Sequence, residues 1–308
     1  MKKISIVGAG RVGESTAQFL AQQGGFRDIV LTDIREGMAS GVALDIQQSG
    51  LLFDFDIRVT GSENPAAMEG SDAVVITAGL PRKPGMSRSD VLEANLAVTS
   101  SVMNDVMRYA PNAFVIVVTN PVDVLTYAAW RQTGWERRRI FGLSGVLDSA
   151  RMAAFIALET GLSVRDVTAL VLGGHGDSMV PMPRYTTING ISIEHFLNPQ
   201  QIAAIVQRTR QGGAEVLALK KTSSANDSPA AAVAVMVGAL CNDRKRVLPC
   251  VALLDGEYGQ RDIAIGVPVV IGERGVERVI ELKLTEEERR GFAESAAQVR
   301  KDLALLPR

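Results

Sequence analysis

The chain has 308 residues, of which 46% are hydrophobic, so it can bury the core of two domains or of one large α/β unit. Lysine and arginine number 33 against 34 acidic residues, a balance that excludes a global charge attracting nucleic acid or an anionic membrane surface. Cys241 and Cys250 are too few for a disulfide framework, and no apolar run approaches the roughly 20 residues that span a bilayer, so we expect a cytoplasmic protein.

The first half of the sequence alternates short β-branched runs with segments of helical period, which predicts parallel βαβ units. Several runs are continuously apolar, as expected of strands covered on both faces by helices. We therefore predict a doubly wound Rossmann sheet in residues 1–145. The predicted strands are "KISIVGAG" (3–10), "DIVLTDI" (28–34), "DIRVTG" (56–61), "DAVVITAG" (72–79), "FVIVVTNP" (114–121) and "RRIFGLSG" (138–145).

The pattern changes after residue 145, and residues 146–308 are predicted to form a mixed α/β catalytic domain. Helices are expected at 147–161, 199–221 and 228–241, and strands at 166–174, 247–254 and 262–272. Asn189-Gly190 predicts a hairpin turn within 184–193, and Thr285 begins a capping box that opens the last helix. No linker separates the halves, so we expect them to pack closely.

The motif "GAGRVG" places Gly8, Gly10 and Gly13 between a predicted strand and a predicted helix. In this context the first glycine makes a tight turn, the second lets a pyrophosphate approach the helix N-terminus, and the third lets helix and strand pack closely. Asp33 ends the next predicted strand, where a carboxylate can accept hydrogen bonds from the adenine ribose. The pattern predicts dinucleotide binding. Asp33 favours NAD over NADP, although Arg35 lies close by, and helix capping is the alternative role for Asp33.

Two further segments carry candidate chemistry. "AGLPRKPGMSR" (78–88) holds Arg82, Lys83 and Arg88, and is either a solvated basic loop or a lid that closes over an anionic substrate. "LGGHGDSMVP" (172–181) holds His175, which is either a surface histidine in a turn or a proton-transfer group, since imidazole titrates near neutral pH. His195 has no comparable context and is interpreted as structural.

These motifs, with "VTNPVD" (118–123) and "GVLDSAR" (145–151), follow one another in an order that resembles the lactate and malate dehydrogenase family nearly from end to end. Within that family the chain resembles the lactate-dehydrogenase-like malate dehydrogenases of bacteria. The resemblance implies that His175 transfers the proton and that Asp148 is its partner. An imidazole held by a carboxylate is fixed in one tautomer and stabilised when charged.

The resemblance also implies roles for residues that contact substrate or cofactor. Arg151, one helical turn after Asp148, would bind the substrate's C1 carboxylate through its planar guanidinium. Arg88 would stabilise charge developing on the reacting carbonyl oxygen. Asn120 would hydrogen-bond the substrate near the nicotinamide, and Asn120 and Asn95 would both contact the cofactor.

The resemblance implies that the residue at the position of Arg82 selects the substrate. An arginine there would pair with the second carboxylate of malate or oxaloacetate, and it would be left unpaired with lactate or pyruvate. Lys83 takes this role if the loop register shifts by one residue. The segment "TSSANDSPAAA" (222–232) departs from the family's aromatic pattern and carries Asn226 and Asp227, in a stretch that the resemblance implies lies near the substrate. Ser224 is a candidate substrate contact.

The expected activity is therefore reversible NAD-dependent oxidation of (S)-malate to oxaloacetate, without a metal, by a homo-oligomer (tetramer or dimer) that binds a small dicarboxylate and neither nucleic acid nor membrane. A lactate or other 2-hydroxyacid dehydrogenase is the nearest alternative. An NAD-dependent glycosidase that uses a divalent metal and a non-catalytic NAD sensor are more distant alternatives.

Overall fold

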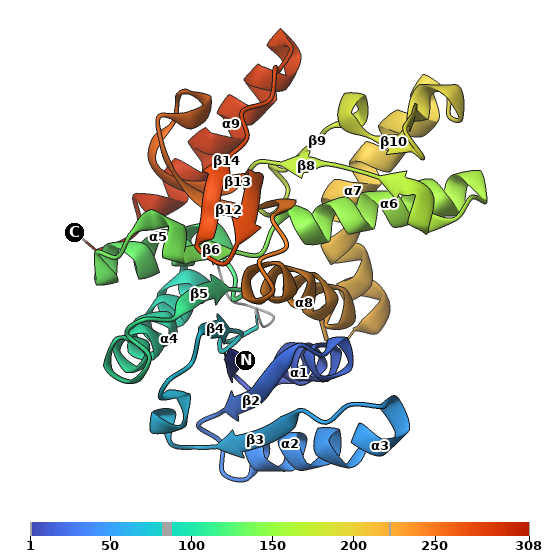
Figure 1. Cartoon of the computed structure of the whole chain (residues 1–308). Helices are drawn as coiled ribbons and strands as arrows, with labels where there is room; N and C mark the ends of the chain where they lie inside the picture. Colours follow the sequence, from blue (N-terminus) through green and yellow to red (C-terminus); the bar gives the residue numbers. More distant parts are fainter. Residues whose placement is uncertain (1, 82–87, 222, 308) are drawn as a thin grey trace.

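A computed structural model describes residues 2–81, 88–221 and 223–307. Its centre is a nine-stranded sheet in the order β14-β13-β12-β6-β5-β4-β1-β2-β3 (Figure 1). Strands β1 to β6 run parallel, and β12 to β14 extend the sheet in antiparallel fashion. The strands are β1 (Lys2–Val7), β2 (Phe26–Thr32), β3 (Arg58–Ser62), β4 (Ala73–Ile76), β5 (Phe114–Val117), β6 (Ile140–Gly142), β12 (Arg246–Asp255), β13 (Arg261–Gly272) and β14 (Gly275–Val279).

Helices cover both faces of this sheet. Side chains that alternate along β1, β4 and β5 separate into two buried clusters, one packed against α1, α2 and α8 and the other against α4 and α5. The continuous apolar runs of the sequence are explained by this double coverage. The helices are α1 (Arg11–Gln23), α2 (Met38–Gln48), α3 (Gly50–Phe53), α4 (Arg88–Tyr109), α5 (Val122–Thr133), α6 (Gly145–Thr160), α7 (Pro199–Lys220), α8 (Asp227–Cys241) and α9 (Glu286–Leu303).

The predicted fold class, a Rossmann sheet with an α/β C-terminal part, is confirmed. All six strands expected before residue 146 are present, the Asn189-Gly190 turn has positive φ angles of 48° and 84°, and the capping box at Thr285 is formed. The expected strand at 166–174 is instead broken into two short strands in different small sheets, and β14 was not predicted. The small sheets contain β7 (Val167–Thr168), β8 (Val171–Leu172), β9 (Val180–Pro181), β10 (Thr187–Ile188) and β11 (Ile191–Ser192).

The two halves of the chain share the central sheet at β6. This strand pairs in parallel with β5 and in antiparallel fashion with β12, where Gly142 lies opposite Val251. Helix α6 begins three residues after β6, so it starts at the edge of the sheet where the parallel strands end. Loops that follow the carboxyl ends of parallel strands are where open α/β sheets bind ligands. Among the described helices, none has both the length and the apolar character required to cross a membrane.

Candidate active site

The glycine loop after β1 has the geometry that its motif predicts. Gly8 has a φ of +104°, and a Cβ there would lie 2.6 Å from the Ala78 backbone nitrogen. A Cβ on Gly13 would lie 1.9 Å from the Gly8 carbonyl oxygen, whereas one on Gly10 would meet nothing within 4 Å among the described residues. Gly10, the N-cap residue of α1, has no side chain that could cap the helix. The open space and uncapped helix end fit a pyrophosphate.

Asp33 lies at the end of β2, beside this loop. Its Oδ2 accepts hydrogen bonds from the Ala9 backbone nitrogen at 2.8 Å and from Arg35 Nη2 at 2.9 Å, and its Oδ1 accepts from Arg35 Nε at 2.9 Å. The Arg35 side-chain bonds lower the pKa of Asp33 to about 2. Asp33 is thus ionised, and ribose hydroxyls would share it with Arg35. Ile34 is 99% exposed next to it, an apolar surface that the sequence analysis did not single out.

Asn95 and Asn120 come together where β4 and β5 end. The buried Asn95 accepts a hydrogen bond from the Leu80 backbone nitrogen at 2.7 Å, and its Nδ2 donates to the carbonyl oxygens of Leu80 and Asn120 at 3.1 and 2.8 Å. Asn120 itself is exposed and precedes α5 through a cis bond to Pro121. Asn95 therefore ties two loops together, and its contact with the cofactor stays a prediction.

Asp148 joins the two other candidate residues on the catalytic side. It lies in the first turn of α6, and its side chain is 2% exposed. Its Oδ2 is 2.8 Å from His175 Nδ1, and its Oδ1 accepts from Arg151 Nη1 at 3.0 Å. As the i,i+3 spacing predicts, Asp148 and Arg151 share a helix face. One carboxylate thus orients an imidazole and a guanidinium together.

The contact with Asp148 affects both the pKa and the tautomer of the His175 ring. Burial lowers the pKa of His175, but the Asp148 carboxylate outweighs burial, so the net pKa lies above 6.5. Because Asp148 accepts from Nδ1–H, the neutral ring carries its lone pair on Nε2. Within the described part of the chain, Nε2 forms no hydrogen bond. Nε2 is therefore available to take or give a proton.

The glycines around His175 serve packing. The side chain of His175 is only 14% exposed, so these glycines do not make it a surface residue. Gly173 has a φ of +85° and exchanges backbone hydrogen bonds with Gly266 of β13, and a Cβ there would lie 2.6 Å from Ser295 Oγ. A Cβ on Gly174 would lie 2.8 Å from Val299 of α9. The glycines let the loop lie directly against β13 and α9.

Asp123 is a polar neighbour of His175 to which the sequence analysis gave no role. It lies in the first turn of α5, and its Oδ2 accepts a hydrogen bond from the His175 backbone nitrogen at 2.8 Å. The signal was in "VTNPVD", where an acid follows Asn-Pro at the end of a buried strand. A local motif does not indicate that this acid meets a loop some fifty residues further along the chain.

Other expected residues are placed differently. Arg82 and Lys83 lie outside the described residues, and Arg88 begins α4, with its side chain outside the description. Asp227 accepts a hydrogen bond from Ser15 of α1 at 3.3 Å, so the departure at "TSSANDSP" adjoins the helix of the glycine loop. His195 is exposed.

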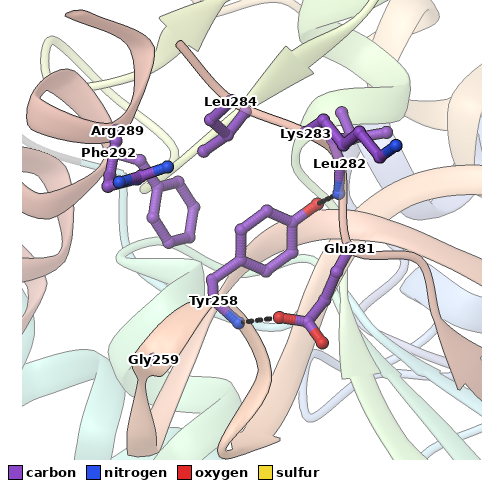
Figure 2. Close-up of a pocket in the computed structure, with 8 residues that line it drawn as sticks. All are labelled: Tyr258, Gly259, Glu281, Leu282, Lys283, Leu284, Arg289 and Phe292. Atoms are coloured by element: carbon purple, nitrogen blue, oxygen red, sulfur yellow. Dashed lines mark hydrogen bonds between the residues drawn. The ribbon is translucent and has the colours of Figure 1, made fainter. Parts of the chain in front are cut away.

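A separate hollow of about 320 Å³ lies between the segment after β14 and α9 (Figure 2). Tyr258 lines this hollow, and the centroid of its ring lies 5.0 Å from that of the Phe292 ring. Its hydroxyl accepts a hydrogen bond from the Leu282 nitrogen, and its backbone nitrogen donates to Glu281 (Figure 2). The same hydroxyl donates to the Ile280 carbonyl oxygen. The hydroxyl and the backbone nitrogen of Tyr258 therefore hold the segment after β14 in place. None of the residues that meet at His175 lines this hollow.

A dinucleotide-binding βαβ unit beside an Asp–His–Arg constellation defines the class of nicotinamide-dependent dehydrogenases. The similarity of the sequence to known protein families indicates the same class. Residues 2–142 match the NAD binding domain of lactate/malate dehydrogenase, and residues 145–306 match its alpha/beta C-terminal domain. The chain belongs to the lactate/malate dehydrogenase family, whose members are NAD-dependent oxidoreductases acting on a CH–OH group. The expected family, enzyme class and cofactor are thereby confirmed.

Relatives resemble the chain over its whole length. It is 62% identical to the malate dehydrogenase of Thioalkalivibrio sulfidiphilus (98% of this chain and 99% of that protein) and 62% identical to that of Nitrosococcus oceani (100% and 99%). The malate dehydrogenase structure from Picrophilus torridus has a TM-score of 0.95 at 44% identity, covering 99% and 97% of the two chains. A lactate dehydrogenase of Cryptosporidium parvum, solved with lactic acid and NAD, has a TM-score of 0.94 at 38% identity, covering 99% of each.

Two glycine substitutions separate folding from cofactor binding. Gly13→Ala should lower the free energy of unfolding by about 1–3 kcal/mol, because its methyl group would overlap the Gly8 carbonyl. Gly10→Ala should leave stability within about 0.5 kcal/mol but weaken NADH binding at least about tenfold, since only the approach of the phosphates is obstructed. Denaturant unfolding and NADH fluorescence titration measure the two effects. Equal stability losses in both variants would contradict this division.

The chain has only two histidines, so their imidazole resonances can be assigned with a single His195→Gln variant. His175 should titrate above pH 6.5, and Asp148→Asn should lower that pKa. Because the folded pKa is raised, the stabilisation from this pair is fully present below about pH 6.5 and is lost as the pH rises through the folded pKa. NMR titration of the free protein measures the pKa of His175 in the wild type and in Asp148→Asn. An unchanged pKa in the variant would exclude the Asp148 carboxylate as the cause of the raised pKa.

Proposed function

We propose that this protein is a malate dehydrogenase that catalyses reversible NAD-dependent oxidation of (S)-malate to oxaloacetate. The observation that carries the proposal is the Asp148 carboxylate, which holds His175 and Arg151 together and leaves Nε2 of the ring without a partner in the described structure. Relatives named malate dehydrogenase at 62% identity support it. The close structural match to a lactate dehydrogenase means that the fold does not decide between substrates.

In the proposed mechanism, His175 Nε2 removes the hydroxyl proton of malate, and NAD, when bound, supplies the hydride acceptor. The imidazolium that forms is stabilised by the carboxylate of Asp148, which contacts the ring and is nearly inaccessible to water. Arg151 pairs with the C1 carboxylate through N–H groups that its bond to Asp148 leaves free. In the reverse direction, protonated His175 gives its proton to the carbonyl oxygen.

The choice between dicarboxylate and monocarboxylate substrates is assigned to the loop at residues 78–88. Arg82 would pair with the second carboxylate, or Lys83 would if the register is shifted, and Arg88 would stabilise charge on the reacting oxygen. A lactate or other 2-hydroxyacid dehydrogenase is the second candidate. It would use the same His175, Asp148 and Arg151.

We further propose that residues 1–145 act as the NAD-binding domain and residues 146–308 as the catalytic domain. Gly8, Gly10, Gly13 and Asp33 would contact the cofactor from the first. A homo-oligomer, a cytoplasmic location and a place in the tricarboxylic acid cycle complete the proposal and stay predictions.

The first test is NADH oxidation by the purified protein with oxaloacetate and with pyruvate in parallel, in the presence of EDTA. Turnover should be rapid with oxaloacetate and weak with pyruvate, because only the dicarboxylate pairs with the loop cation. Preference for pyruvate would establish the second candidate. Loss of activity in EDTA would support a metal-dependent enzyme, and NADH binding without any turnover would support a sensor.

A His175→Asn variant is the matched control for this assay. It should bind NADH nearly as the wild type does, while kcat falls by about 10²- to 10⁴-fold. Turnover retained within a factor of ten would show that His175 is not the proton carrier.

Arg82→Gln tests the specificity assignment. We expect kcat/KM for oxaloacetate to fall by about 10²-fold or more and that for pyruvate to change by less than about tenfold, since the arginine is paired only with the dicarboxylate. Lys83→Gln is the control for the register of the loop. If the Lys83 variant shows the selective loss, the discriminating contact belongs to Lys83, and equal losses on both substrates would remove Arg82 from this role.

A further inference from the structure

Asp123 is a buried carboxylate, and only one of its two oxygens has a hydrogen-bond partner within the described chain. It is 5% exposed, its Oδ2 accepts the His175 backbone N–H at 2.8 Å, and its Oδ1 has no hydrogen-bond partner among the described residues. Burying a carboxylate with an unpaired oxygen is costly, and a well-packed apolar residue would be cheaper. A benefit at the site is therefore expected to offset this cost.

The surroundings of Asp123 limit what that benefit can be. Among the described residues, the charged groups that act on Asp123 are His175, in the adjoining loop, and Asp148, on α6. Arg151 acts on the same imidazole from α6. Helix α9 presents Ser295 and Val299 to the loop at Gly174, and neither side chain titrates near neutral pH. Asp123 thus contacts the main chain of His175, whereas Asp148 contacts its imidazole ring.

We propose that Asp123 is a positioning residue that anchors the His175 main chain to α5 and whose negative charge favours the protonated imidazole during proton transfer. The inference rests on the proposed role of His175. It links the segment that follows Asn120 in the cofactor half to the proton carrier in the catalytic half. Burial raises the pKa of the Asp123 carboxyl to about 6, so its charge is present above that pH and is lost below it.

Two substitutions separate the anchor from the charge. Asp123→Asn keeps an oxygen that can accept the His175 N–H but removes the charge, so the His175 pKa should fall by roughly 0.5–1 unit. The acid limb of kcat/KM for malate oxidation should move to lower pH by the same amount, because this direction requires neutral His175. Asp123→Leu removes both functions, and kcat should fall by about 10²-fold or more.

Asp177→Asn is the matched control, because Asp177 is an exposed acid two residues from His175 in the same loop. It should leave the pKa of His175 and the pH profile unchanged. An equal shift in both variants, or no shift in Asp123→Asn, would overturn the proposal. Asp123→Ser, which also supplies a neutral acceptor, replaces Asp123→Asn if the latter does not fold, and failure of both to fold would reduce Asp123 to a purely structural group.

The NMR titration of His175 in the free protein keeps this test independent of the substrate. If the protein turned over no 2-oxoacid, the proposed function would fail, yet the titration would still report whether Asp123 sets the pKa of His175. If turnover were normal but the titration did not respond to Asp123→Asn, only the inference about Asp123 would fail.

Discussion

The candidate site depends on one carboxylate with two partners. Asp148 is almost completely withdrawn from water, and each of its oxygens contacts a different functional group, His175 on one side and Arg151 on the other. A buried charge is tolerated only when its partners compensate for the lost hydration. His175 and Arg151 therefore each stabilise the carboxylate with which the other is paired. In the proposed function, proton transfer and carboxylate recognition are coupled through this single side chain, so a substitution of either partner is expected to alter the other.

The fold brings these groups together by simple topology. Strands β1, β2, β5 and β6 have their carboxyl ends on the same side of the sheet, and each is followed by a segment that carries a candidate site residue. His175 is the exception, because it arrives from a loop held by Gly266 of β13, Ser295 of α9 and Asp123 of α5. Its position consequently depends on elements from both halves of the chain.

Much of this arrangement could be predicted from the sequence, where local rules apply. The glycine spacing after β1, the i,i+3 relation of Asp148 and Arg151, and the Asn-Gly turn each depend on neighbours within a few residues. The contact between Asp123 and His175 could not be predicted in this way, nor could the division of residues 166–174 into two strands. Both are decided by tertiary packing: the loop glycines are needed because β13 and α9 approach closely, and no local pattern records that approach.

The shared strand β6 also bears on how the chain folds during synthesis. Its antiparallel partner β12 follows it by roughly a hundred residues, so β6 remains an unpaired sheet edge until most of the catalytic half has left the ribosome. An open, apolar edge is a template for association with other chains. The nascent cofactor half is thus open to misassembly at this edge while roughly a hundred further residues are synthesised, and β12, which covers the edge, is made after the loop of His175 but before β13 and α9.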